Sequence, residues 1–264
     1  MRIATWNVNS IKMRAGHVLN WLTATQTDVL CLQELKVETR LFPYEAFQEA
    51  GYEAHVFGQK TYNGVAVLLR KETTREAQPF TQNIPGFDDP QSRLLGVSFS
   101  TAAGPMRVLS AYFPNGAEVA SEKFTYKLAW INALSAYLKP LVKEALPLFL
   151  CGDFNIAPED LDCWNPALWE GNILVSPEER AAFRDLLALG LKDSFRLFEA
   201  ETKAYTWWDY RMLGFQKNHG MRINHILVND AAAKLLAGAT IDRAPRKLEK
   251  PSDHTPYVIE LSIS

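Results

Sequence analysis

Short apolar runs, separated by polar and glycine- or proline-containing segments, recur along the chain and predict β-strands. Several runs alternate apolar and polar residues with a period of two, as half-buried strands do. Others are almost entirely apolar, so we expect some strands to be covered on both faces. The predicted strands are Ile3–Val8, Val29–Leu32, Gly64–Leu69, Leu95–Phe99, Met106–Tyr112, Leu146–Cys151, Arg222–Val228 and Tyr257–Ile263.

Helical signals lie between these runs. The clearest begins at Ser176, which can cap a helix, with Pro177 in the first turn and Glu179 completing a capping box. Gly190 can close this helix. Strands alternating with helices indicate an α/β or layered α+β fold, and no linker divides the chain, so we expect residues 1–264 to form one domain. Further helices are expected over residues 10–27, over Ser121–Leu138 with Pro140 bending or ending it, and over Ala231–Leu236 after Asp230.

Composition narrows the class of protein. The chain has 264 residues, of which 47% are hydrophobic and 22% charged, as in an ordinary soluble domain. Its net charge of -2 gives no overall positive field that would indicate a nucleic-acid partner, although a local basic face is compatible with this charge. Cys31 and Cys151 lie in apolar runs and are expected to be buried thiols of a reducing compartment. No apolar run is long enough for a membrane span, and the first residues lack a signal-peptide layout, so we expect a cytoplasmic protein.

Polar residues that suit catalysis stand where the predicted strands end. The apolar run up to Cys151 leads directly into Gly152, Asp153 and Asn155. Alone, this stretch could be a turn, because Gly, Asp and Asn are common turn residues. Its repetition favours a site at the ends of the strands, where open α/β sheets usually keep their chemistry. The other strand-end residues are Asn7, Glu34, Tyr112, Asn224, Asp253 and His254.

These residue types favour metal-assisted hydrolysis of a phosphate ester. Glu34, Asp253 and the carbonyl of Asn7 are hard oxygen donors, which suit Mg²⁺ or Mn²⁺. The cysteines and histidines lack zinc-site spacing. The chain contains neither a phosphate-binding G-x-x-x-x-G-K-[ST] loop nor a G-x-S-x-G nucleophile elbow. Carboxylates held by amides, together with a histidine, fit hydrolysis with a bound metal.

The whole set of motifs resembles the exodeoxyribonuclease III (AP endonuclease) family of the endonuclease/exonuclease/phosphatase superfamily. The similarity runs from Ile3 to about Leu261. It implies a deoxyribonuclease I-like four-layer sandwich, with two facing, mainly antiparallel sheets flanked by helices. The motifs that carry it are Trp6-Asn7-Val8-Asn9, Leu32-Gln33-Glu34-Leu35-Lys36, Gly64-Val65-Ala66-Val67, Tyr112-Phe113-Pro114-Asn115-Gly116, Gly152-Asp153-Phe154-Asn155-Ile156-Ala157-Pro158, Thr206-Trp207-Trp208-Asp209-Tyr210-Arg211 and Lys250-Pro251-Ser252-Asp253-His254.

The resemblance also implies an activity. Members of this family are DNA-repair nucleases with 3′→5′ exonuclease, abasic-site endonuclease and 3′-end-cleaning activities, and they leave 3′-hydroxyl ends. The expected cofactor is Mg²⁺, for which Mn²⁺ can substitute. The expected partner is double-stranded DNA with abasic sites or with blocked or recessed 3′ ends, bound by a monomer that needs no membrane.

Roles carry over onto matching residues. Glu34 is implied to hold the metal, with Asn7 and Asp253 close by. Asp153 is implied to activate the attacking water (some schemes make it the acid for the leaving group), and Asn155 to hold Asp153 or the phosphate. Tyr112 and His254 are implied to donate to phosphate oxygens.

The sequence indicates the residues that contact DNA less clearly than it indicates the catalytic residues. Trp207 and Trp208 match the lesion-facing aromatic loop of the family and could stack on a displaced nucleotide or pack in the core. Asn115 is a further candidate DNA contact. Arg93, Lys123 and Lys127 are candidate phosphate contacts, and solvated surface charge is the alternative for each. Residues Leu161–Asn172 are a candidate source of the preference between lesions.

One residue departs from the family. Asn224 stands where an Asp usually pairs with the site histidine. Asn can accept a hydrogen bond but cannot supply negative charge, so we expect His254 to be charged less readily near pH 7. Turnover is therefore expected to be slower than in an Asp-bearing relative, with its optimum at lower pH.

Two other functions compete with a nuclease. A superfamily phosphatase or lipid phosphodiesterase would share the same core, although the Trp207–Arg211 segment argues against it. A lesion-binding protein with catalysis impaired by Asn224 is the third interpretation.

Overall fold

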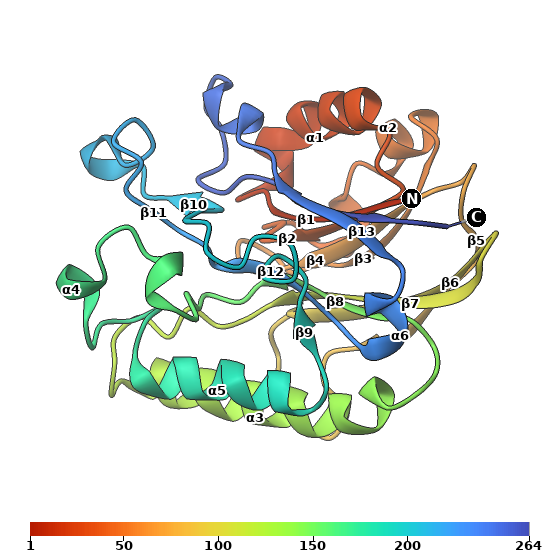
Figure 1. Cartoon of the computed structure of the whole chain (residues 1–264). Helices are drawn as coiled ribbons and strands as arrows, with labels where there is room; N and C mark the ends of the chain where they lie inside the picture. Colours follow the sequence, from red (N-terminus) through yellow and green to blue (C-terminus); the bar gives the residue numbers. More distant parts are fainter. Residues whose placement is uncertain (264) are drawn as a thin grey trace.

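The computed structural model describes residues 1–263, in which two six-stranded sheets face each other with helices outside both (Figure 1). The first sheet has the strand order β13-β14-β1-β2-β4-β3 and the second the order β5-β6-β7-β8-β12-β9. One neighbouring pair in each sheet is parallel, β1 with β2 and β7 with β8, and the other pairs are antiparallel. The mainly antiparallel four-layer sandwich is therefore confirmed.

The strands of the first sheet are β1 (Arg2–Asn7), β2 (Val29–Gln33), β3 (Tyr52–Phe57), β4 (Val65–Arg70), β13 (Leu236–Ile241) and β14 (Tyr257–Leu261). Those of the second are β5 (Arg75–Gln82), β6 (Leu94–Thr101), β7 (Gly104–Tyr112), β8 (Leu148–Asp153), β9 (Lys192–Asp193) and β12 (Asn224–Val228). A separate two-stranded sheet joins β10 (Trp207–Trp208) to β11 (Gly220–Met221).

Helices form the two outer layers. In Figure 1, α1 (Ile11–Thr25) and α2 (Tyr44–Glu49) lie above the sheets, and α3 (Glu122–Val142) and α5 (Pro177–Ala188) lie below them. The short helix α4 (Pro166–Trp169) lies with β10 and β11 at the left end of the sandwich. The remaining helical segments are α6 (Asp230–Ala233) and the 3₁₀ turns η1 (Thr39–Leu41), η2 (Asp160–Asp162), η3 (Arg211–Leu213) and η4 (Ala244–Lys247).

Strands buried on both faces explain the nearly continuous apolar runs. In β2, Val29 and Cys31 pack into the layer between the two sheets. Leu30 and Leu32 point the other way and pack in the cluster that includes residues of α1. Because successive side chains of a strand alternate between faces, a strand covered on both sides needs apolar residues at every position. The prediction of doubly covered strands is confirmed.

The predicted helix starts are also confirmed. Ser176 Oγ accepts a hydrogen bond from the Glu179 amide at 3.2 Å, and the Glu179 carboxylate accepts one from the Ser176 amide at 3.1 Å. This is the expected capping box. Gly190 follows the helix with a φ of 109°, in the left-handed region that favours glycine.

Several element predictions were wrong or incomplete. The predicted helix after Asp230 ends at Ala233, and Leu236 begins edge strand β13, which pairs with β14. α3 continues two residues past Pro140. Arg222 falls between β11 and β12, where its backbone N–H donates to the Asp162 carbonyl at 2.9 Å and its buried guanidinium pairs with Asp162 and Asp193. Strands β3 and β5 and helix α2 were not foreseen; β5 is a largely exposed edge strand, so its sequence lacks an apolar alternation.

Candidate active site

Strand pairing, parallel between β7 and β8 and antiparallel between β8 and β12, brings predicted polar residues to one edge of the sandwich. Tyr112 of β7 is in register with Asp153 of β8, and Asn224 of β12 is paired with the same Asp153 from the other side. Asn7 closes β1 beside the end of β2, which Glu34 follows. The three neighbouring strands of the second sheet thus place their polar residues side by side, and β1 supplies Asn7 from the facing sheet.

Asn7 connects the two principal carboxylates. Its Nδ2 donates to Glu34 Oε2 at 2.9 Å and to Asp153 Oδ2 at 2.8 Å. Its Oδ1 accepts from the backbone N–H of Asn9 at 2.9 Å. Asn7 is fully buried, so this bridge sets the separation of the two acids. In this arrangement Asn7 presents its amide nitrogen, not its carbonyl oxygen, to Glu34.

Asp153 is a buried carboxylate with several donors. It is 1% exposed, and its Oδ1 accepts from the Asn155 amide at 3.0 Å. His254 Nε2 lies 3.6 Å from its Oδ2. Burial raises the pKa of Asp153 above its ordinary value, while His254 and the Asn7 bond oppose that rise. A carboxylate with a raised pKa is a better proton acceptor for an attacking water.

His254 is oriented by the residue that departs from the family. Its Nδ1 lies 2.8 Å from Asn224 Oδ1. Because a carboxamide oxygen only accepts, Nδ1 carries the proton in this bond. Asn224 is fully buried, and among the described residues its Nδ2 has no hydrogen-bond partner. An Asp in this place would leave no such unpaired donor.

A second set of contacts surrounds Asp253. Its Oδ1 accepts from Asn9 Nδ2 at 3.0 Å, and its Oδ2 accepts from Trp207 Nε1 at 2.9 Å. Lys36 Nζ donates to Asn9 Oδ1 at 2.6 Å and lies 2.9 Å from Glu34 Oε1. Asn9 and Lys36 were not among the predicted site residues, although both lie in the motifs that carry the resemblance. The sequence could have indicated them, because Asn9 lies two residues after Asn7 and Lys36 lies two residues after Glu34.

The backbone at this edge is strained. Asn9, Glu34, Lys36 and Asn155 all have positive φ angles, of 44°, 58°, 56° and 50°. Non-glycine residues pay about 1–3 kcal/mol each for such conformations, and they cluster at functional sites where the surrounding structure enforces them. Non-glycine residues with positive φ also occur elsewhere in the chain, so this strain accompanies the site without locating it.

Tyr112 completes the edge as a protonated phenol. Burial, together with the nearby charges of Glu34 and Asp153, raises its pKa well above the ordinary value. Arg93 lies over the Tyr112 ring, 5.1 Å from its centroid, and donates to the Tyr112 carbonyl at 3.1 Å. Tyr112 therefore keeps its proton at neutral pH and can donate a hydrogen bond.

The donor set fits a hard divalent cation at Glu34. Within residues 1–263, no three His, Cys, Asp or Glu side chains form a ready-made metal cluster. Mg²⁺ does not require one, because it is commonly held by one or two carboxylates and keeps several waters. The Glu34 side chain is 18% exposed, so a hydrated cation can reach this carboxylate, where it would share Oε1 with the Lys36 ammonium. Asn7 borders it, and Asp253 is linked to it through Asn9 and Lys36.

Two of the predicted DNA contacts are wrong. Trp208 is fully buried, with its ring against Phe215 at 5.1 Å, because adjacent residues of a strand face opposite sides. Trp207 faces the site instead. Lys127 is also fully buried, in an ion pair with Glu179, so it cannot reach a phosphate at the surface.

Two cavities adjoin the site. One, of about 440 Å³, is lined by Arg93, Asn115 and Lys123. Lys123 is exposed, whereas Arg93 is 8% exposed and already bonded to Gln91 and Tyr112. The other, of about 750 Å³, is lined mainly by aromatic and apolar residues, and its members are Trp164, Leu168, Trp169, Asn172, Trp207, Asp209, Arg211, Met212, Gly214 and His219.

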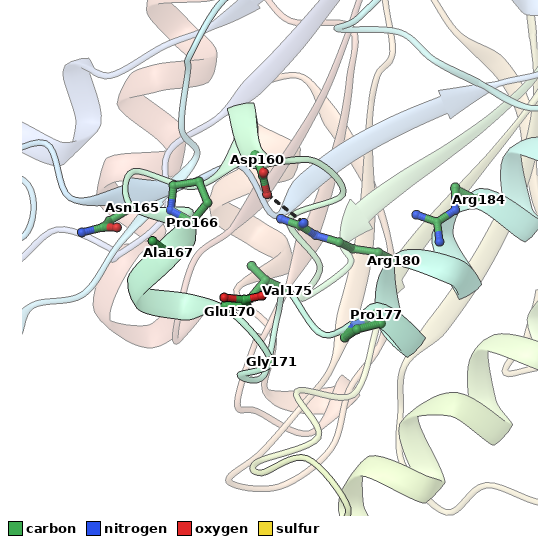
Figure 2. A pocket seen from close by; sticks show the side chains of 10 residues that line it. All are labelled: Asp160, Asn165, Pro166, Ala167, Glu170, Gly171, Val175, Pro177, Arg180 and Arg184. Carbon is green, nitrogen blue, oxygen red and sulfur yellow. Dashed lines mark hydrogen bonds and ion pairs between the residues drawn. The ribbon is translucent and has the colours of Figure 1, made fainter.

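Other residues of segment 164–172 line a further cavity, also of about 750 Å³, which Figure 2 shows. The further cavity is lined by α4 and the start of α5, where Arg180 pairs with Asp160 at 2.9 Å. None of the predicted site residues lines it. We therefore place the candidate active site on the Trp207 side of α4.

No helix among the described residues is long and apolar enough to cross a bilayer. Cys31, Cys151 and Cys163 are all buried free thiols, as was expected for the first two.

Comparisons with known proteins point in one direction. A family model described as "Endonuclease/Exonuclease/phosphatase family" matches residues 4–254. Exodeoxyribonuclease III of Haemophilus influenzae is 36% identical over 98% of this chain and 99% of its own length. A solved structure of the 3′ phosphatase NExo from Neisseria, bound to a product DNA hairpin, is 41% identical with a TM-score of 0.91, covering 99% of each chain. An AP endonuclease from Archaeoglobus fulgidus is 34% identical with a TM-score of 0.91, covering 100% of each chain.

Proposed function

This chain belongs to the Endonuclease/Exonuclease/phosphatase family, and from that premise we propose that it is a Mg²⁺-dependent DNA-repair nuclease. The resemblance to exodeoxyribonuclease III and the enzyme class, a phosphodiester hydrolase, are confirmed by the full-length relatives. The proposed substrates are duplexes with recessed or blocked 3′ ends or with abasic sites, hydrolysed to leave 3′-hydroxyl ends. We further propose a cytoplasmic monomer, since its buried free cysteines suit a reducing compartment.

One observation carries the proposal most directly. Asp153, a buried acid with a raised pKa, is held by Asn7, Asn155 and His254, and Asn7 also holds Glu34 at 2.9 Å. Asn7 therefore fixes the position of Asp153, the proposed proton acceptor, relative to Glu34, the proposed metal-binding carboxylate. Such preorganisation is what hydrolysis of a phosphodiester requires.

The residues divide the reaction between them. Asp153 orients a water for attack on phosphorus and accepts its proton, while Asn155 holds the Asp153 carboxylate through its backbone N–H. Tyr112 and His254 donate to phosphate oxygens as negative charge develops. Glu34 would hold Mg²⁺, with Asn7 and Asp253 beside it. When bound, the metal neutralises charge on the phosphate and on the leaving 3′ oxygen.

DNA is proposed to lie over the two cavities that flank this centre. Trp207 lines the aromatic cavity, where a displaced 3′-terminal nucleotide or lesion sugar could stack. Lys123, Asn115 and Arg93 line the opposite cavity and are proposed to face the phosphate backbone. Arg93 acts there mainly by holding Tyr112, since most of its guanidinium is already bonded.

The test compares cleavage of an abasic-site duplex with cleavage of a recessed 3′-end duplex, each with Mg²⁺ and with EDTA. We expect Mg²⁺-dependent cleavage that Asp153→Asn lowers by about 10²–10⁴-fold, the usual range for a lost general base. Asp185→Asn, at an exposed position of α5, is the matched control and should leave the rate unchanged. Hydrolysis of phosphoinositides or sphingomyelin without DNA cleavage would contradict the proposal. So would tight lesion binding without cleavage in excess Mg²⁺.

A further inference from the structure

Lys127 is an unusual residue to find in the interior. It lies in α3 with its side chain fully buried and pairs with Glu179 of α5, which is also fully buried. Lysine is almost never fully buried unless it is paired, because removing the ammonium from water is costly. Burial lowers the pKa of Lys127, and the neighbouring Glu179 carboxylate opposes that change. A buried Lys127 ammonium, retained despite the cost of removing it from water, needs an explanation.

The contacts of the ammonium point to the active site. Lys127 Nζ donates to the Asn155 carbonyl at 2.7 Å, to the Asn115 carbonyl at 3.1 Å and to Glu179 Oε1. An ammonium has three N–H donors, so all of them are used. Two of the three acceptors belong to the loops that follow β7 and β8, and these loops carry Asn115 and Asn155.

Asn155 is held from both sides of its backbone. Its N–H donates to Asp153 Oδ1 at 3.0 Å, and its C=O accepts from Lys127. Its φ of 50° lies in the left-handed region, which Asn adopts more readily than most residues. Its side chain adds bonds to Phe113 O at 3.0 Å and from Asn115 Nδ2 at 3.2 Å. The residue that orients Asp153 is therefore clamped by a buried cation.

Glu179 holds the Lys127 ammonium in place and is itself fixed by bonds near the start of α5. Its carboxylate accepts from the Leu174 amide at 3.1 Å, from the Ser176 amide at 3.1 Å and from Ser176 Oγ at 2.6 Å. These bonds fix it at the start of α5. The backbone of Gly116 also lies directly on the lysine stem, since a Cβ there would be 3.0 Å from Lys127 Cδ.

Helix packing alone does not explain the pair. α3 and α5 already meet through an apolar cluster that includes Ile131, Leu134, Phe183 and Leu186. Replacing a buried ion pair by uncharged residues is often neutral for stability, whereas removing one partner is not. If Lys127 and Glu179 served only stability, replacing both by uncharged residues would leave stability and activity nearly unchanged.

We propose that Lys127 is a positioning residue for hydrolysis, acting through the Asn155 carbonyl to hold Asp153 in place, and that Glu179 balances its charge. This role rests on the proposed nuclease function. It predicts a loss of kcat without a matching loss of DNA binding, because Lys127 is buried and bonds to the backbone carbonyl of Asn115 rather than to its side chain.

The test measures kcat, KM and the thermal unfolding midpoint with the recessed 3′-end duplex. The variants are Lys127→Met, Glu179→Gln and the double variant, with Lys139→Met at an exposed position of α3 as control. We expect both single variants to unfold at lower temperature and the double variant to recover most of that midpoint. Lys127→Met and the double variant should show kcat about tenfold or more below wild type with KM within about twofold. Glu179→Gln keeps an acceptor for the ammonium and should retain kcat within about threefold.

A double variant with wild-type kcat would overturn the positioning role. If the double variant does not fold, the single variants decide: equal loss of kcat in Glu179→Gln and Lys127→Met would also overturn it. A wild-type chain that cleaves no DNA would instead refute the proposed nuclease function, so the two failures are distinct.

Discussion

Replacing Asn224 by Asp tests how much the charge beside the site histidine matters. Asn224 Oδ1 accepts from His254 Nδ1 at 2.8 Å, and both side chains are buried. The Asn224 Nδ2 has no partner among the described residues. Asn224→Asp keeps the acceptor in place, adds a negative charge and removes the unpaired donor.

The size of the effect follows from this hydrogen bond. A neutral bond contributes about 0.5–1.5 kcal/mol and a bond to a charged group about 1.5–3 kcal/mol. The difference, about 1–1.5 kcal/mol, corresponds to a rate change of up to roughly tenfold if it is expressed fully in the transition state. Asp153 is the cross-strand neighbour of position 224, and its charge opposes the new carboxylate. We therefore expect kcat near pH 7 to rise by about threefold to tenfold.

The assay is a pH–rate profile on the recessed 3′-end duplex for the wild type and Asn224→Asp, each repeated in a His254→Gln background. If the charge acts through His254, the gain disappears in that background. Asn224→Ala removes the acceptor and should lower the rate at every pH. Superimposable profiles of the wild type and Asn224→Asp, or an equal gain without the histidine, would refute the reasoning.

Three further predictions follow from burial and charge. Trp208→Ala should lower the free energy of unfolding by about 3–5 kcal/mol, because it leaves a cavity at a fully buried position. Trp207→Ala should lower the free energy of unfolding by less and should instead lower activity, because Asp253 loses its hydrogen bond from Trp207. Denaturant melts and kinetic measurements on both variants distinguish the two effects. Glu34→Gln should raise the Mg²⁺ concentration needed for half-maximal cleavage by about tenfold or more, as a metal titration would show. Burial lowers the pKa of His225 from 6.5 to about 4, so the unfolded chain takes up a proton there first. Stability should therefore fall by up to about 3 kcal/mol as the pH drops from about 6.5 to about 4, and His225→Gln should remove that part of the slope in pH-dependent melts.

The strand-end residues could be read from the chain because the signal is local. Asp153 ends the apolar strand β8, Asn155 follows two residues later, and Asn7 ends β1. A strand that ends in acids and amides places them at the edge of a sheet whatever the rest of the fold does. The capping box at Ser176 was predictable for the same reason, since its bonds join residues three apart.

Contacts between distant residues were decided only by the tertiary structure. Trp207 and Trp208 are adjacent and chemically alike, and only the packing around β10 turned one toward Asp253 and the other into the core. Lys127 looks like a surface charge on a helix until Glu179, 52 residues later, lies against it. The edge strand β13 was not predicted, and its first residue, Leu236, was assigned to a helix; the strand forms by pairing with β14.

The sequence by itself therefore determined which chemistry the protein carries and at which end of its strands, because strand periodicity and motif residues are properties of neighbouring positions. The tertiary structure alone decided which side chains share a hydrogen bond, a charge or a buried face. Asn7 bridges Glu34 and Asp153, and Lys127 reaches the carbonyl of Asn155. These contacts depend on how the two sheets and the outer helices are stacked, and no local pattern along the chain encodes that stacking.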